Sequence, residues 1–191
     1  MKKFIVEGKF DFITRTIVRD LITHFKNHRN GQFYLPHDIT QDEVYDFSNL
    51  DTKFNVILDL EEDKNIEEFD VDAEYWDDDQ TMYVKIKSNP NHRHSILQDL
   101  LKELNQTIRH ELEHINQYEQ YYVFPKEPKD HEKYYSQPHE LDAQRAGFKR
   151  RSKKEKVPME VLVRNWFEKN KNKYKMKPDQ VERVIAKILE R

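Results

Sequence analysis

The spacing of apolar residues predicts one long amphipathic helix near the middle of the chain, from about Ser95 to Tyr121. Within it, apolar residues recur at steps of three and four residues, and they share one face because a helix turns by about 100° per residue. They are Leu97, Leu101, Leu104, Ile108, Leu112 and Ile115. We expect this face to pack on a core and the other faces to carry polar side chains.

The segments before this helix predict a small sheet. Phe54–Leu60 is an apolar run with β-branched residues, which is typical of a buried strand. Apolar and polar residues alternate in Thr81–Ser88, as expected of a strand with one buried face. Together with Phe69–Trp76 it predicts a hairpin around Asp77–Gln80, and Gln32–Leu35 is a further candidate strand.

Helical patterns occupy the two ends of the chain. Phe12–Phe25 has apolar residues at helical spacing. Pro158–Asn170 and Pro178–Arg191 each begin with proline, which suits the first turn of a helix. We expect their apolar residues to face a core: Val161, Leu162 and Trp166 in the first, and Val181, Val184, Ile185 and Ile188 in the second. Together with the strands, these segments predict an α+β fold with a small mixed or antiparallel sheet.

The composition narrows the classes of protein. Hydrophobic and charged residues each make up 36% of the chain, and 11 Phe and 10 Tyr supply bulky core material. The lack of cysteine excludes disulfides, thiolate zinc sites and cysteine nucleophiles. The apolar run Phe4–Val6 ends at Glu7 and is too short for a secretory signal peptide. No stretch reaches the ~20 apolar residues of a membrane span. We therefore expect a soluble, cytoplasmic protein with no membrane partner.

Charge is distributed unevenly. Residues 149–191 contain 15 Lys and Arg against 6 Asp and Glu, a net +9, so residues 1–148 carry −12 of the total of −3. The ordinary interpretation of the basic end is a solvated helical surface. The functional interpretation is contact with nucleic acid or an acidic partner. We expect residues 1–148 to form the main domain and residues 149–191 to form a basic helical extension packed on it.

The long helix contains the pentapeptide His110-Glu111-Leu112-Glu113-His114, a His-Glu-x-x-His motif. Residues four apart lie on one face of a helix, so His110 and His114 can bind one metal ion from the same side. The Glu111 carboxylate can then take a proton from the water that attacks a peptide bond. Three protein ligands and one open position are the usual set of a catalytic zinc site.

A third ligand must come from elsewhere in the chain. Pro138 opens a helical pattern that continues through Leu141–Phe148, and Glu140 lies in its first turn, 26 residues after the motif. This position makes Glu140 the first candidate. His131 and His139 are the alternatives, and either would give a three-histidine site.

A Glu-x-x-Ala helix after His-Glu-x-x-His resembles the gluzincins, zinc peptidases whose third ligand is a glutamate on a following helix. The string Glu140-x-x-Ala143-x-Arg145-Ala146 is also similar to the corresponding helix of the small ImmA/IrrE-type metallopeptidases. The resemblance covers roughly Thr107 to Phe148. It implies a zincin-like fold in which the strand before the motif helix, Thr81–Ser88 here, forms the rim of the cleft and can pair as an edge strand with an extended substrate. The alternative is that Thr81–Ser88 is an ordinary strand of the sheet.

The resemblance further implies a zinc-dependent peptidase that acts on peptides or proteins. Zinc would be held by His110, His114 and Glu140, and Glu111 would act as general base. A second electrophile is usually needed to stabilise the tetrahedral oxyanion. The candidates for this role are Tyr134, Tyr135, His131 and His139.

Two alternatives are open. With His131 or His139 as third ligand, the chain would resemble the SprT-like proteases, which act near DNA, and the basic residues 149–191 would serve nucleic-acid contact. The other alternative is not an enzyme but a zincin fold that binds zinc structurally or has become a scaffold. Glu113 and Asn116 favour it, because the related families usually have uncharged or apolar residues there.

Overall fold

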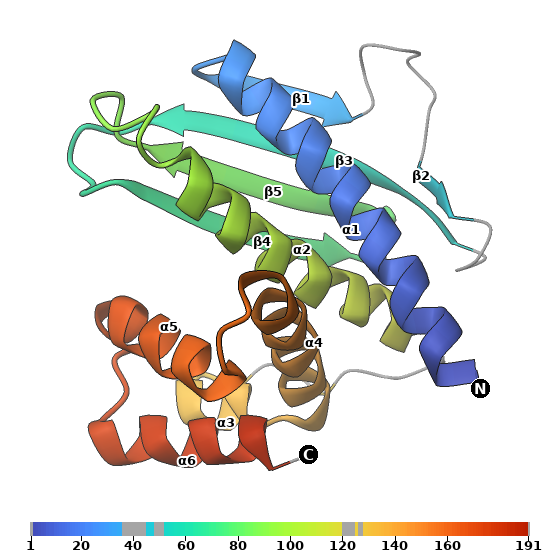
Figure 1. Cartoon of the computed structure of the whole chain (residues 1–191), viewed down its shortest axis with the longest axis vertical. Coiled ribbons are helices and arrows are strands. Elements are labelled where there is room, and N and C mark those ends of the chain that lie inside the picture. Colours follow the sequence, from blue (N-terminus) through green and yellow to red (C-terminus); the bar gives the residue numbers. More distant parts are fainter. Residues whose placement is uncertain (1, 36–44, 48–51, 120–124, 126–127, 191) are drawn as a thin grey trace.

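The computed structural model describes residues 2–35, 45–47, 52–119, 125 and 128–190 (Figure 1). These residues form six helices and five strands, which confirms the α+β class. The strands are β1 (Gly31–Leu35), β2 (Tyr45–Phe47), β3 (Thr52–Glu62), β4 (Phe69–Trp76) and β5 (Thr81–Ser88). The helices are α1 (Lys2–Asn27), α2 (Leu97–Glu119), α3 (His131–Tyr135), α4 (Pro138–Glu155), α5 (Met159–Tyr174) and α6 (Pro178–Leu189).

The sheet is mixed, with the strand order β1-β3-β5-β4, and β2 pairs with one end of β3. β3 and β5 run parallel, and β1 and β4 are antiparallel to their neighbours. The predicted hairpin is confirmed as β4 and β5, but the prediction that Thr81–Ser88 is the edge strand was wrong. That segment is β5, which lies between β3 and β4, and β4 is the edge strand. β4 carries Asp70, Asp72 and Glu74 at exposed alternate positions, and such charges are typical of edge strands.

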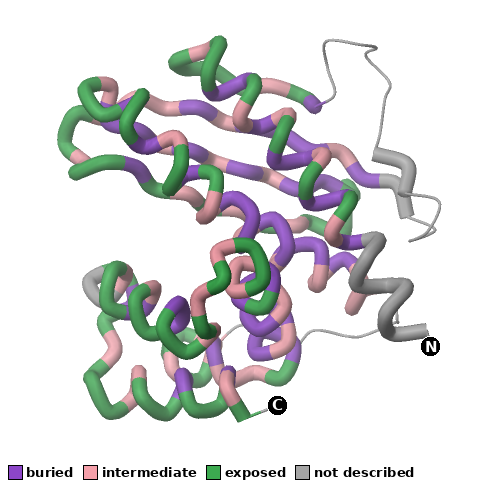
Figure 2. Tube along the Cα trace, in the orientation of Figure 1, coloured by how far each residue is buried: buried purple, intermediate pink, exposed green. Residues whose placement is uncertain are grey.

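α1 and α2 lie against the same face of the sheet and enclose the first hydrophobic core with it (Figures 1 and 2). The predicted apolar face of α2 is confirmed from Leu104 to Ile115, where its members are fully buried. At the start of the helix the prediction was wrong, because Leu101 is 41% exposed and Leu100 is buried in its place. Both residues belong to one broad apolar stripe, and only the packing of α1 and the sheet decides which side of it is covered.

The second hydrophobic core joins α3, α4, α5 and α6. Its buried members are Tyr135, Leu141, Phe148, Leu162, Val163, Phe167, Tyr174, Val184, Ile185 and Ile188. Val161, which the sequence predicted as core, is 43% exposed, and Val163 is buried in its place. α4 also packs on α2, so it connects the two cores. Residue 148 lies inside α4, and the division of the chain into 1–148 and 149–191 stays a prediction.

Candidate metal centre

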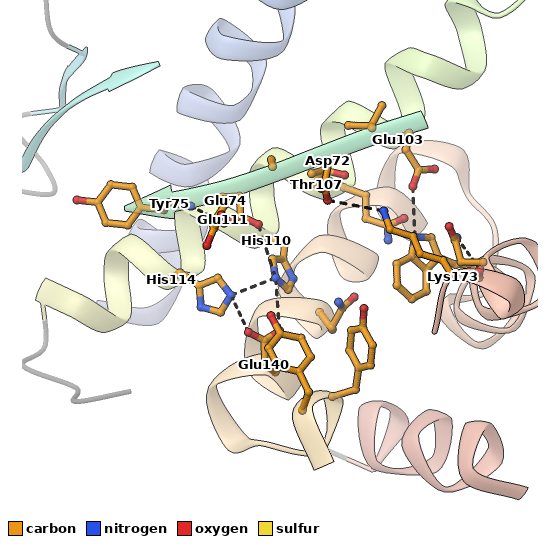
Figure 3. Close-up of a pocket in the computed structure, with 18 of the residues that line it drawn as sticks. Asp72, Glu74, Tyr75, Glu103, Thr107, His110, Glu111, His114, Glu140 and Lys173 are labelled. Atoms are coloured by element: carbon orange, nitrogen blue, oxygen red, sulfur yellow. Dashed lines mark hydrogen bonds and ion pairs between the residues drawn. The ribbon is translucent and has the colours of Figure 1, made fainter. Parts of the chain in front are cut away.

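Three side chains from two helices meet beside the edge of the sheet (Figure 3). Their ligand atoms all lie within 4.8 Å of one another: two come from α2, at His110 and His114, and the third from α4, at Glu140. The Nε2 atoms of His110 and His114 are 3.1 Å apart. The two oxygens of Glu140 lie 3.3 Å from His114 Nε2 and 3.7 Å from His110 Nε2. The predicted convergence of Glu140 on the motif is therefore observed.

This group fits a metal ion. Glu140 is only 3% exposed, and its Oε2 atom has no hydrogen-bond partner among the described residues. A buried carboxylate oxygen without a partner is costly, and a bound cation would satisfy it. Two imidazole nitrogens and one carboxylate oxygen form a donor set that suits zinc and other divalent transition metals.

The electrostatics of the group also favour a cation. Burial, reinforced by the neighbouring His114, lowers the pKa of His110 to about 3. Burial opposes the charge of His114, but its hydrogen bond to Glu140 and the charge of Glu111 outweigh this and raise its pKa to about 9. Burial also opposes the charge of Glu140, yet the hydrogen bond from His114 and the nearby imidazoles lower its pKa to about 2. The Glu140 carboxylate is therefore ionised, and without a metal its charge is balanced by the proton on His114. A bound metal ion can supply the positive charge in place of that proton.

Glu111 lies between the ligand group and the sheet. Its Oε2 atom accepts a hydrogen bond from the backbone N–H of Tyr75 on β4 at 3.1 Å, and its Oε1 atom lies 3.8 Å from His110 Nε2. Burial raises the pKa of Glu111 to about 8, and the charge of Glu140 adds to this shift. A carboxyl group whose pKa is near neutrality can both accept and release a proton at neutral pH.

A cavity of about 390 Å³ opens beside this group. β4 lines it from Phe69 to Tyr75, and α2, α3, α4 and α5 contribute the other walls (Figure 3). The N–H of Tyr75 points away from β5, because Glu111 accepts its hydrogen bond. The backbone N–H and C=O groups of successive residues in a strand point to opposite edges, so every second residue points to the same edge. The N–H and C=O groups of Val71 and Ala73 therefore point away from β5, as those of Tyr75 do. An edge of backbone donors and acceptors therefore faces the cavity.

The structure places the other candidate residues differently. Tyr134 lines the cavity and hydrogen-bonds the Glu140 carboxylate. Tyr135 also lines the cavity, but it is buried in the second core, where its ring centroid lies 5.0 Å from that of Tyr174. His139 Nε2 lies 3.8 Å from Glu140 Oε1, whereas His131 is exposed at the start of α3. Neither histidine belongs to the group whose ligand atoms converge.

Two contacts of the site were not predicted from the sequence. Tyr75 reaches Glu111 through its backbone, so no side-chain pattern could reveal it. Gln117 accepts a hydrogen bond from His114 Nδ1 at 3.0 Å and donates one to the carbonyl of His139 at 3.1 Å. Its position three residues after His114 is a detectable pattern, since such residues are neighbours on a helix.

Several basic side chains of residues 149–191 form ion pairs, within the segment or with residues before it. Arg164 on α5 pairs with Glu182 at 2.8 Å, and Arg183 on α6 pairs with Glu132 at 2.6 Å. Lys173 lies 3.7 Å from Asp72 at the far end of the cavity. Contact of this segment with nucleic acid stays a prediction.

Comparison with known proteins gives no further assignment. No family model, no curated protein and no solved structure matches the chain. Among the helices that the structure describes, none has the length and apolar content needed to span a bilayer.

Proposed function

We propose that this chain is a zinc-dependent peptidase that hydrolyses peptide bonds in a peptide or protein substrate. The observation that carries the proposal is the position of Glu111. Its buried carboxylate lies beside the converged group of His110, His114 and Glu140 and is held by the edge strand that lines the cavity. A structural metal site requires neither an additional carboxylate beside its ligands nor an adjoining cavity.

The cavity suits an extended peptide. The outward backbone groups of Val71 and Ala73 offer hydrogen bonds to a strand that lies beside β4, which is a common mode of peptide recognition. Such a strand runs past Tyr75, whose N–H bonds Glu111. One of its carbonyl groups is thereby brought close to the ligand group.

His110, His114 and Glu140 would hold the zinc ion. When bound, zinc makes hydroxide available at neutral pH and polarises the scissile carbonyl. Glu111 accepts the proton of the attacking water and passes it to the leaving amine. The hydroxyl of Tyr134, which lines the cavity and contacts Glu140, is the best-placed of the predicted groups to donate to the oxyanion.

Three variants test this proposal with metal analysis and a peptide-cleavage assay. We expect Glu111→Gln to keep zinc and lose about 10²–10⁴-fold in activity, because the amide cannot act as a base. We expect His110→Ala to lose both metal and activity. Glu113→Gln is the matched control, since its carboxylate pairs with Arg109 at 2.9 Å and lies outside the ligand group.

The outcomes separate the alternatives. Purified wild-type protein without bound zinc would contradict the proposal. Zinc without hydrolysis of any peptide would favour the non-catalytic zinc-binding alternative. Cleavage by Glu111→Gln at the wild-type rate would show that another group is the base.

A further inference from the structure

One glutamine touches both helices that carry the metal-ligand group. Gln117 lies on α2, one turn after His114, and its amide contacts the His114 ring on one side and the backbone of His139 in α4 on the other. His139 immediately precedes Glu140 in the chain. We propose that Gln117 is a positioning residue that sets both the orientation of His114 and the place of Glu140 beside it. The inference rests on the proposed metal binding.

The hydrogen bonds of Gln117 fix which way its amide points. The backbone carbonyl of His139 can only accept, so the Gln117 Nε2 group must donate to it, at 3.1 Å. The amide oxygen then faces His114 Nδ1 at 3.0 Å, and this oxygen can only accept. His114 therefore carries a proton on Nδ1 and keeps Nε2 directed at His110 and Glu140, as a metal ligand requires.

The second half of the contact acts on the other ligand helix. Glu140 lies in the first turn of α4, and the carbonyl that Gln117 contacts belongs to the residue before it. A single side chain therefore links His114 on α2 to the first turn of α4, which carries Glu140. Partners of this kind outside the ligand set typically change metal affinity by about 10–100-fold when they are removed.

Two substitutions separate the two halves. Gln117→Met keeps the length of the side chain and loses both hydrogen bonds. Gln117→Glu keeps an acceptor oxygen for His114 Nδ1 and loses the donor to His139. Gln117→Glu therefore tests the contact with α4 alone, and Gln117→Met tests both contacts together.

Gln106→Met is the structural control. Gln106 is a buried glutamine on α2, one turn before His110, and its side chain accepts a hydrogen bond from Arg151 of α4 at 2.9 Å. Its side chain lines the cavity but is not part of the ligand group. Its loss weakens the α2–α4 contact without touching His114. We expect it to lower the stability of the protein while zinc affinity is unchanged.

Zinc affinity is measured by competition with a chromophoric chelator. The visible absorption spectrum of the cobalt-substituted protein reports the geometry of the ligands, and urea unfolding of the metal-free protein reports its stability. We expect Gln117→Met to bind zinc about 10–100-fold more weakly with an altered cobalt spectrum, because it loses both contacts. We expect Gln117→Glu to lose less affinity, because it keeps the contact with His114 and loses only the contact with His139. Wild-type affinity in either Gln117→Met or Gln117→Glu, or equal losses in the two variants, would overturn the inference. An equal loss in Gln106→Met would also overturn it, whereas a wild-type protein that binds no metal would overturn the proposed function itself.

Discussion

Gly147 allows α4 to approach α2 closely enough for Glu140 to reach the histidines. A Cβ atom at position 147 would lie 2.7 Å from the backbone carbonyl oxygen of Gln106 and 3.2 Å from its Cγ atom. The carbonyl belongs to the backbone of α2 and cannot rotate away. An ordinary contact begins at 3.4 Å, so in Gly147→Ala the two helices must separate by about 0.7 Å at this point.

Two opposing effects set the size of the change in stability. Alanine is favoured over glycine within a helix by about 0.8–1 kcal/mol. Overpacking of a close contact costs about 1–3 kcal/mol. We therefore expect Gly147→Ala to lower the free energy of unfolding by roughly 0–2 kcal/mol rather than raise it.

Residue 147 lies about 10 Å along α4 from Glu140, so the displacement reaches the ligand group, whose distances tolerate only ~0.2 Å. Zinc affinity should fall by about tenfold or more.

Urea unfolding of the metal-free protein and zinc competition measure the two effects separately. Lys149, exposed on the same helix, provides the control, because comparing Lys149→Gly with Lys149→Ala gives the propensity difference in α4 without a clash. A Gly147→Ala variant that is more stable than the wild type by that full propensity difference and binds zinc equally well would show that the helices do not meet in this way.

Two further predictions concern the packing of α6. Arg145 is 5% exposed and donates to the carbonyls of Ile188 and Lys187 at 3.0 and 2.9 Å, so Arg145→Met leaves them without these donors. It should cost about 2–4 kcal/mol by urea unfolding, and a loss under about 0.5 kcal/mol would contradict the assigned role. The hydrogen bonds from Arg183 and Gln180 lower the pKa of Glu132 from 4.5 to about 2, so the contact stabilises the fold above pH 4.5 and this contribution is lost as the pH falls towards 2. The difference in free energy of unfolding between wild type and Glu132→Gln should therefore be constant above about pH 5 and shrink below pH 4.5, and a difference independent of pH would be inconsistent with this pairing.

The parts of the site that depend on local helix geometry could be predicted from the sequence. His110 and His114 share a face because they are four residues apart within one helix, and that relation holds whatever the helix packs against. The helix that carries Glu140 was also predictable, since Pro138 marks its first turn. The α+β class follows in the same way from local alternation and periodicity.

Only the tertiary structure decided how these elements meet. Strand patterns do not encode order in the sheet, so β4 rather than Thr81–Ser88 is the edge that lines the cavity. Apolar periodicity marks a broad stripe and not the part that a neighbour covers, which is why Leu101 and Val161 are exposed. Glu140 reaches the histidines because α4 packs closely on α2 at Gly147, and Gln117 contacts both helices. These relations join residues far apart in the chain, and their geometry is set by packing that no local pattern contains.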